Sequence, residues 1–247
     1  MISKRIIIVL TFQDGVLFRT KQFNPDYRYT DNFIGNKYVD EIVLIDVSQN
    51  KNNRDLFYKV IKKISKSCFV PIVVGGHINT FEEINKLQDF GADRILINSI
   101  IHTNEKLVLK IINHFGSQFV IGGIDCFLKN RNYEIYINHG KTRLEIDIKN
   151  CLKKFEKCKI GEILVQSIER DGSLRGFDNK LNNLIKKNVR VPVIACGGAG
   201  NWDHFVDAFK ISKVDGLCTN NIYHYSEKSL ELIKNTLNKK KIYVRTE

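Results

Sequence analysis

An internal repeat of about half the chain length restricts the possible folds more than any other feature of the sequence. The segment Val70–Gly76 returns as Val191–Gly198, 121 residues later at its start and 122 residues later at its glycines. Two further segments recur at the same offsets: Asp93–Asn98 as Asp215–Asn220, and Asp40–Leu44 as Gly161–Val165. Four strand–helix units in each copy predict two half-barrels, about 1–118 and 119–247, that close into a single-domain (β/α)8 TIM barrel. A doubly wound α/β sheet is the alternative, but it offers no reason for the repeat.

Short apolar and β-branched runs alternate with amphipathic segments, which is typical of parallel strand–helix units. The predicted strands are Arg5–Leu10, Glu41–Asp46, Pro71–Val74, Arg94–Asn98, Phe119–Asp125, Glu162–Ser167, Pro192–Ala195 and Gly216–Thr219. Apolar residues three and four apart predict helices at Arg54–Ser67, Thr80–Phe90, Asn104–Phe115, Ile146–Lys157, Asn179–Lys187 and Trp202–Ile211. A hairpin is predicted from Tyr133–Ile137 and Leu144–Ile146, joined by Asn138–Lys141.

The composition indicates a soluble protein whose core needs no covalent reinforcement. Of 247 residues, 43% are hydrophobic and 27% are charged, and a domain of this length buries roughly three-quarters of its extended-chain surface. No apolar run approaches the roughly 20 residues of a membrane span, and the N-terminus shows no signal-peptide cleavage site. We therefore expect a cytoplasmic protein without a membrane partner. The six cysteines form no Cys-x-x-Cys pair, and we expect them to be reduced and buried, without a metal.

The net charge of +12 is compatible with an anionic partner, either a nucleic acid or a phosphorylated metabolite. The lysines, however, are scattered over predicted helices and lack the interleaved aromatic residues of a single-strand binder. A bias of the composition toward Lys and Asn explains the charge without a function behind it. We therefore expect a phosphorylated small molecule as the ligand and no nucleic acid partner.

The loops that follow the strands are the first place to look for function, because barrel enzymes build their sites there. Gly75–Ile78 follows the third strand, and Gly197–Gly200 follows the seventh. Glycine lets backbone N–H groups approach an anion closely, so the duplicated pair predicts two phosphate sites on opposite rims. The predicted phosphate-binding residues are Gly76, His77, Asn98, Ser99, Asp171, Gly172, Gly198, Ala199, Gly200, Asn220 and Asn221.

Two strand ends carry carboxylates that could transfer protons. Asp125 ends the fifth strand and is the candidate general acid or base, whereas we interpret Asp46, at the end of the second strand, as a loop cap. The half-barrel equivalent of Asp125 is Thr11. A neutral hydroxyl forms hydrogen bonds but has no proton affinity suited to abstraction near pH 7. Asp125 and Thr11 are thus the candidate catalytic positions, and the symmetric carboxylate pair is missing.

Four charged residues of alternating sign stand at the opposite ends of predicted strands: Arg5, Glu41, Arg94 and Glu162. They could be ordinary surface residues. If they point into the barrel, they must pair with one another, because isolated buried charges are very costly. The sequence therefore predicts a salt-bridged gate at the lower mouth.

The chain resembles, over essentially its whole length, the family of the cyclase subunit of imidazole glycerol phosphate synthase (HisF). The resemblance lies in Lys4–Ile7, Val74–Gly76, Ala92–Arg94, Ile97–Ser99, Gly161–Leu164, Arg170–Gly172 and Cys196–Gly200. It implies a (β/α)8 barrel whose lower face docks a HisH-type glutaminase, with ammonia passing through the barrel to the upper face. It also implies that the gate and the two phosphate sites fall on the residues named above. No cofactor or metal is expected.

Several positions depart from the pattern of family members that act as a cyclase (a lyase-type activity in histidine biosynthesis). Such members carry one Asp at the end of strand one and another at the end of strand five; Asp125 matches the second, and Thr11 replaces the first. Thr30–Asn32 replaces the usual Gly-Asp-Pro, Gln166 replaces a Thr, and Asn221 replaces a phosphate-binding Ser. The segments Gly15–Tyr29 and Val39–Glu41 are similar to the WbuZ-like branch, which supplies ammonia to an ATP-dependent amidotransferase for acetamidino-sugar synthesis.

Four functions are compatible with these observations. The leading hypothesis is a HisF-like ammonia-conducting subunit that serves sugar amidation for a surface polysaccharide or glycan. The second is an imidazole glycerol phosphate synthase with altered acid–base chemistry, since the loss of one proton-transfer group costs about 10²–10⁴-fold and leaves a slow enzyme. The third is a non-catalytic protein that binds nucleic acid, and the fourth is a single-chain phosphosugar isomerase of the HisA type. Thr11 argues against the isomerase, which also needs two carboxylates.

Overall fold

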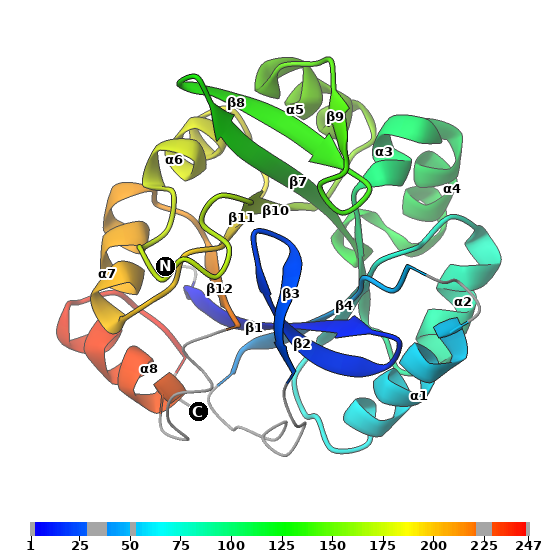
Figure 1. Cartoon of the computed structure of the whole chain (residues 1–247), viewed down its shortest axis with the longest axis horizontal. Coiled ribbons are helices and arrows are strands. Elements are labelled where there is room, and N and C mark those ends of the chain that lie inside the picture. The colour runs from blue at the N-terminus through cyan, green and yellow to red at the C-terminus, as the bar shows by residue number, and fades with distance from the viewer. Residues whose placement is uncertain (1–2, 29–38, 50–52, 221–228, 246–247) are drawn as a thin grey trace.

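The eight predicted strands all form, and they pair as neighbours into one closed barrel. A computed structural model describes residues 3–28, 39–49, 53–220 and 229–245. The barrel strands are β1 (Arg5–Gln13), β4 (Glu41–Asp46), β5 (Ile72–Gly75), β6 (Arg94–Ile97), β7 (Val120–Lys129), β10 (Glu162–Ser167), β11 (Val193–Cys196) and β12 (Gly216–Thr219). The sheet runs from β10 through β12, β1 and β4 to β7, and a parallel β10–β7 pairing closes it (Figure 1). This closure rules out the open doubly wound sheet.

The sequence repeat is visible as repeated hydrogen bonds at the starts of the strands. The Asp93 carboxylate accepts a hydrogen bond from the backbone N–H of Ile72 at 2.8 Å. Its counterpart Asp215 accepts one from the N–H of Val193 at 2.9 Å. In both halves the aspartate N–H in turn donates to the carbonyl of the same strand residue, at 2.9 and 2.8 Å. The two halves of the barrel thus repeat equivalent contacts at equivalent positions.

Alternation along the strands separates an inner layer of side chains from an outer core. The inner layer of buried residues consists of Ile7, Val9, Val43, Val73, Leu96, Ile121, Leu164, Ile194 and Cys218. The larger outer core lies between the strands and the helices and includes Ile6, Leu44 and Phe57. The inner layer makes the barrel a packed structure in which polar groups occupy the two ends of the axis.

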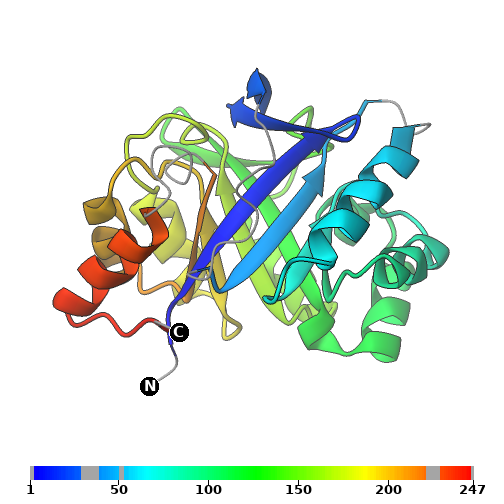
Figure 2. The same ribbon diagram turned by 90° about the horizontal axis from the view of Figure 1, so that it is seen from below.

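Helices surround the barrel on the outside (Figures 1 and 2). They are α1 (Arg54–Ser65), α2 (Phe81–Asp89), α3 (Ser99–Thr103), α4 (Glu105–Phe115), α5 (Ile148–Lys157), α6 (Asn179–Lys187), α7 (Trp202–Ile211) and α8 (Ser229–Lys239), with a 3₁₀ turn at Ser117–Phe119. The six predicted helices are confirmed, whereas α3 and α8 were not predicted. Because α3 has only five residues, it is too short for helical periodicity to reveal. None of the helices in the described ranges is long and apolar enough to cross a membrane.

Two hairpins extend the barrel at its upper mouth. The predicted hairpin forms from β8 (Asn132–Ile137) and β9 (Thr142–Leu144), with β8 antiparallel to β7. The second was not predicted: β2 (Val16–Lys21) pairs with the end of β1, and β3 (Asn24–Arg28) pairs with β2. Figures 1 and 2 show this second hairpin lying over the upper mouth. The upper loops are therefore covered from two sides.

Candidate functional site

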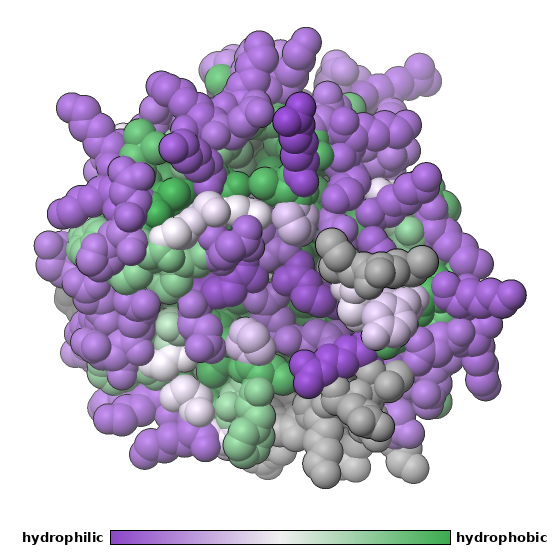
Figure 3. All heavy atoms as spheres, turned by 180° about the vertical axis from the view of Figure 1, so that it is seen from behind, coloured by the Kyte–Doolittle hydropathy of each residue, from purple (hydrophilic) through white to green (hydrophobic). Residues whose placement is uncertain are grey.

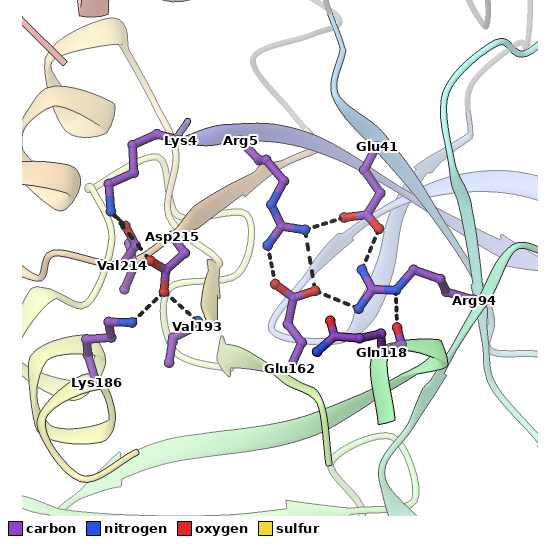
Figure 4. A network of polar contacts seen from close by, with 10 residues as sticks. All are labelled: Lys4, Arg5, Glu41, Arg94, Gln118, Glu162, Lys186, Val193, Val214 and Asp215. Carbon is purple, nitrogen blue, oxygen red and sulfur yellow. Dashed lines mark hydrogen bonds and ion pairs between the residues drawn. The ribbon is translucent and has the colours of Figure 1, made fainter. Parts of the chain in front are cut away.

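The four charged residues at the lower ends of the strands form a closed ring (Figure 4). Glu41 accepts from Arg5 Nη1 at 3.2 Å and from Arg94 Nη1 at 2.8 Å. Glu162 accepts from Arg5 Nη2 and, at 2.7 Å, from Arg94 Nη2. Arg94 also donates from Nε to the carbonyl oxygen of Gln118 at 2.8 Å. Each carboxylate thus contacts both guanidinium groups, and the geometry of the predicted gate ring is present.

Burial and pairing compete within this ring. The Glu41 and Glu162 side chains are only 3% and 4% exposed, so their charges depend on the two arginines rather than on water. Burial raises the pKa of Glu41, and the charges of Arg94 and Arg5 oppose that increase. For Arg5, burial lowers the pKa, but hydrogen bonding and attraction to Glu162, with attraction to Glu41, raise it overall. Two positive and two negative charges leave the ring formally neutral.

The inner apolar layer lies directly above the ring along the barrel axis. Every second residue of β1 lies on one side of the strand, and these residues are Arg5, Ile7, Val9 and Thr11. Of these, Ile7 and Val9 belong to the inner layer. Because side chains alternate across a strand, Arg5 and Thr11 project to the same inner side, at opposite ends of the barrel. The axis therefore passes from charged residues through aliphatic residues to the polar groups of the upper mouth.

Asp125 on β7 is the strongest acid–base candidate at the upper mouth. Its Oδ2 atom accepts a hydrogen bond from Asn98 Nδ2 at 2.9 Å. Burial raises the pKa of Asp125 to about 7; the Asn98 hydrogen bond opposes this increase, and the charge of Asp171 adds to it. A carboxyl group that titrates near neutral pH can either give or take a proton under physiological conditions. The protonation of Asp125 is thus suited to catalysis, although its catalytic role stays a prediction.

Thr11, the second candidate catalytic position, is buried, with 7% of its surface exposed. It pairs with Ile45 of β4 on one side and with Phe18 of β2 on the other. A buried threonine offers a hydroxyl group for hydrogen bonding but no carboxylate. The upper end of β1 therefore differs chemically from the upper end of β7, where Asp125 lies.

Asp46 has the loop-capping role expected for it. Its Oδ1 atom accepts from the Ser48 N–H at 3.0 Å and from the Ser48 hydroxyl at 2.5 Å. Its Oδ2 atom accepts from Arg54 Nη1 at 2.6 Å, and Arg54 Nη2 donates to the Gly76 carbonyl at 2.8 Å. These contacts hold the β4 and β5 loops together and neutralise the Asp46 charge. Arg54 was not predicted to take part, because its position at the start of α1 gave no sign of this contact.

In the first predicted phosphate loop, glycine is required by a close approach to the backbone of the β4 loop. Gly76 has φ of +92°, and a Cβ atom there would lie 2.1 Å from the Asp46 carbonyl oxygen. His77 follows with φ of +53°, and its buried Nε2 has no hydrogen-bond partner among the described residues. Asn98 donates to Asp125, while its buried Oδ1 atom is likewise unpartnered within the described ranges. The loop therefore contains buried polar atoms whose hydrogen-bonding capacity is unused in the described part of the chain.

The second predicted phosphate loop is similarly constrained by glycine. Gly197 and Gly198 have φ of +95° and +100°, and a Cβ at Gly198 would lie 2.2 Å from the carbonyl oxygen of Gly176. The N–H of Gly200 donates to His204 Nδ1 at 3.1 Å. Ala199 lies buried between these glycines, and Asn220 directly follows β12. Asn221 and Thr30–Asn32 lie outside the described residues.

Asp171 and Gly172 lie against the β2–β3 hairpin. Asp171 Oδ2 accepts from the Phe23 N–H at 3.1 Å, and its carbonyl accepts from the Gln22 N–H at 3.2 Å. A Cβ at Gly172 would lie 2.6 Å from the Thr20 carbonyl oxygen. Burial raises the pKa of Asp171, and hydrogen bonds from Phe23 and Thr20 oppose that increase. Asp171 and Gly172 thus pack against the β2–β3 hairpin and help to hold it over the upper mouth. Their part in phosphate binding stays a prediction.

Two contacts could not be predicted from any pattern in the sequence, one at the upper mouth and one at the rim of the barrel. His139, in the turn between β8 and β9, lies with its ring centroid 5.0 Å from that of His77. Lys234 of α8, whose side chain is 4% exposed, forms a 2.7 Å salt bridge with Asp40. His, Cys, Asp and Glu side chains do not gather in groups of three that could hold a metal ion anywhere in the part of the chain that the structure describes.

Comparison with known proteins identifies the family of the chain. The profile of the family described as "Histidine biosynthesis protein" matches residues 8–229. "Imidazole glycerol phosphate synthase subunit HisF" of Hydrogenobaculum sp. (strain Y04AAS1) is 34% identical over 252 residues, which cover 99% of this chain and 100% of the relative. Proteins of the same name from Natranaerobius thermophilus and Bacillus cereus (strain G9842) are 32% and 33% identical, with the same coverage. The chain therefore belongs to the histidine biosynthesis protein family and, within it, to the HisF group.

Proposed function

We propose that this protein is a HisF-like synthase subunit that receives ammonia from a HisH-type glutaminase and conducts it through the barrel to the upper face. There, the ammonia serves an ATP-dependent amidotransferase that builds acetamidino groups on a sugar of a surface polysaccharide or glycan. The observation that carries the proposal is a contrast along β1: Arg5 sits in a complete four-residue ring, whereas Thr11 stands where a cyclase of the family has an aspartate.

The order of layers along the axis supports the passage of neutral ammonia rather than ammonium. A charged ammonium ion loses its hydration shell when it enters an aliphatic layer, and that loss is very costly without a partner. Neutral ammonia is small and carries no net charge, so it can pass between Val9, Val43 and Leu164 as these side chains move. The ring below can exclude bulk cations and open when its bidentate contacts rearrange.

The lower face supports docking of a partner around the ring. Phe69, in the connection between α1 and β5, is 100% exposed, and Ile211 and Tyr243 are 55% and 57% exposed. All three lie in segments that end a helix or precede a strand, which places them at the lower end of the barrel. Figure 3 shows this face, where apolar residues lie among charged ones. Apolar side chains within a polar surround are typical of protein–protein interfaces.

The upper face supports a phosphorylated ligand. The β5–α2 and β11–α7 loops both carry glycines at positive φ where a side chain would collide with backbone atoms. Such loops let peptide N–H groups reach an anion, and their positions in the two halves suit a ligand with two phosphate groups. A ligand of this kind would regulate or position the ammonia delivery, whichever acceptor the pathway uses.

The test is nitrogen transfer in the complex with the cognate glutaminase and the sugar amidotransferase. Glutamine labelled with ¹⁵N in the amide should label the acetamidino product, whereas Arg5→Ala and Arg5→Lys should release labelled ammonia into solution at the same rate of glutamine hydrolysis. Docking of the glutaminase to each variant is measured separately by sedimentation. Absence of label from the sugar in the assembled wild-type complex would reject sugar amidation, and unchanged coupling in both variants would reject the gate.

A second function is favoured by the position of Asp125 at the upper mouth, where its carboxylate accepts a 2.9 Å hydrogen bond from Asn98 and burial raises its pKa to about 7. One poised carboxylate can still transfer a proton, which favours an imidazole glycerol phosphate synthase cyclase. The experiment supplies the phosphoribulosyl formimino substrate with ammonium salt and measures the imidazole product. Product formation that Asp125→Asn abolishes would promote this function over sugar amidation. If the barrel is only a conduit, Asp125→Asn leaves ammonia transfer and glutaminase docking unchanged.

A further inference from the structure

The turn between β8 and β9 contacts the first predicted phosphate loop at two separate points. The His139 ring lies 5.0 Å from the His77 ring, between centroids, at an angle of 51°. The N–H of Asn138 donates to the hydroxyl oxygen of Ser99 at 3.1 Å. The turn thereby bridges the β5–α2 loop and the start of α3, although it comes from a hairpin inserted after β7. Because Ser99 accepts in this contact, its own hydroxyl proton can point to a ligand.

The backbone at this contact is held in conformations that residues other than glycine rarely adopt. His77 has φ of +53°, and Asn138 and His139 have φ of +54° and +57°. Left-handed residues of this kind occur where the surrounding structure holds them, and they concentrate at ligand clamps and active sites. Two of these residues, His77 and His139, are in direct ring contact where the turn meets the β5–α2 loop.

Unused hydrogen-bonding capacity marks the same place. Nε2 of His77 and Oδ1 of Asn98 are buried without a partner in the described part of the chain. Buried polar atoms nearly always find partners in native proteins, so unpartnered atoms on the loops after β5 and β6 are candidate contacts for a group that arrives from outside. An imidazole nitrogen that can protonate, together with the Ser99 hydroxyl, is suited to the oxygens of a phosphoryl group.

Burial keeps the His139 ring neutral. It lowers the pKa of His139 to about 4; electrostatic interaction with His77 and with Lys141 adds to the decrease, and Asp46 opposes it. Asp46 is itself bonded to Arg54 at 2.6 Å, and Lys141 extends outward to Gln49 at 2.8 Å. A dianion bound beside the two rings would oppose this decrease, because a nearby opposite charge favours the protonated imidazole.

We propose that His77 and His139 form a proton-linked anion clamp, in which the tip of the β8–β9 hairpin closes on a phosphoryl group at the β5–α2 loop. Binding takes up one proton from solvent onto an imidazole and changes no covalent bond of the ligand. This inference rests on the proposed function only in taking the upper face as a phosphate site. It adds His139, which comes from a different element, and a dependence of affinity on pH.

The experiment uses sulfate, a dianion whose own charge does not change near neutral pH. Imidazole ¹⁵N chemical shifts in the full-length protein should report protonation at His77 or His139 when sulfate saturates the site at pH 7.5. Calorimetry in two buffers of different ionisation enthalpy should show uptake of about one proton per sulfate. His139→Gln and His77→Gln should each weaken sulfate binding by about 10-fold or more. His114→Gln is the control, because His114 is exposed on α4 and should leave affinity unchanged.

The wild-type protein alone can overturn the proposal, whether or not the variants fold. Sulfate binding with both rings still neutral, or no binding at concentrations that saturate other phosphate sites, would exclude the clamp. Neither measurement needs the glutaminase or turnover. Failure of nitrogen transfer with an intact proton-linked sulfate site would therefore reject the proposed function alone, and active transfer without proton uptake would reject the clamp alone.

Discussion

The lower and upper mouths of the barrel are built from the same strands but differ in how completely their polar groups are paired. At the lower mouth, four charges pair in a closed ring, and its carboxylate side chains are only 3% and 4% exposed. At the upper mouth, Asp125 has a pKa near 7, His139 has one near 4, and buried nitrogen and oxygen atoms lack partners among the described residues. The charges of the lower mouth satisfy one another, whereas the upper mouth keeps buried polar atoms without a partner in the described part of the chain.

This difference predicts different effects on stability at the two mouths. A ring whose charges satisfy one another can remain closed without any ligand, and its disruption should cost stability. Polar groups that are left unsatisfied lower stability and persist when function needs them. Removing a charge from the lower ring should therefore lower stability, whereas neutralising the buried Asp125 at the upper mouth should raise it.

The largest effect is expected at the lower ring. Glu162→Ala removes one carboxylate and leaves Arg5 and Arg94 facing Glu41 alone, so the free energy of unfolding should fall by about 3–5 kcal/mol. Urea denaturation followed by circular dichroism measures this change. Glu145→Ala is the matched control, because the Glu145 side chain is 84% exposed beside Arg143 and its loss should cost about 1 kcal/mol or less. Equal effects of both variants would contradict a buried ring.

A smaller effect of opposite sign is expected at Asp125. The native carboxyl keeps its proton up to about pH 7, whereas the unfolded chain loses it near pH 4. The unfolded state therefore binds fewer protons between these values, and stability falls as pH rises through them. Asp125→Asn removes this loss, so it should raise the free energy of unfolding by about 1–3 kcal/mol at pH 8 and by less at pH 5.

Thermal and urea unfolding at the two pH values test this prediction. Asp207→Asn serves as the comparison, because Asp207 is exposed on α7 and its replacement should have a small effect at both pH values. A decrease in stability of Asp125→Asn at pH 8 would show that the ionised carboxylate is favourably bound, and the two mouths would then be alike.

The smallest effect concerns the contact that holds the hairpin tip over the mouth. Ser99→Ala removes the acceptor of the Asn138 N–H and should cost about 0.5–1.5 kcal/mol. Its sharper signature is local: amide hydrogen exchange should accelerate at Asn138 and leave the barrel strands unchanged. Thr103→Ala, which removes a hydroxyl contact to the Ser99 carbonyl within α3, should not accelerate it. Unchanged exchange in Ser99→Ala would mean that the tip is held by other contacts.

The strands and helices were predictable because each is encoded by nearby residues. Apolar runs such as Ile6–Leu10 and the periodic helix segments carry their own signal, and the repeat specified how many units there are. The antiparallel pairing of β2 with the end of β1 also had a local signal: Asp14 and Gly15 join Gln13 to Val16 with φ of +51° and +74°. Asp-Gly is a favoured pair for this type of two-residue turn. The α8 helix likewise carries buried Leu230, Ile233 and Leu237 at helical spacing.

The charged ring was predictable for a different reason. Arg5, Glu41, Arg94 and Glu162 occupy equivalent starts of four strands, and a barrel brings equivalent positions to one level of its axis. Because the barrel is closed, the equivalent positions of these four residues at the starts of their strands place them close enough to form the ion pairs of the ring. Asp40 and Lys234 show the limit of such reasoning, because their salt bridge joins residues 194 positions apart with no repeat or motif to relate them.

Spacing along the chain thus decided the kind of barrel, the level of the charged ring and the replacement of a carboxylate by Thr11. Folding in three dimensions decided which groups share an environment: Asn98 with Asp125, Asp171 with the β2–β3 hairpin, and His139 with His77. The reason is physical. Periodicity and strand position follow from neighbours in the chain, whereas burial, hydrogen-bond partners and pKa values depend on atoms that only tertiary packing brings within a few ångströms.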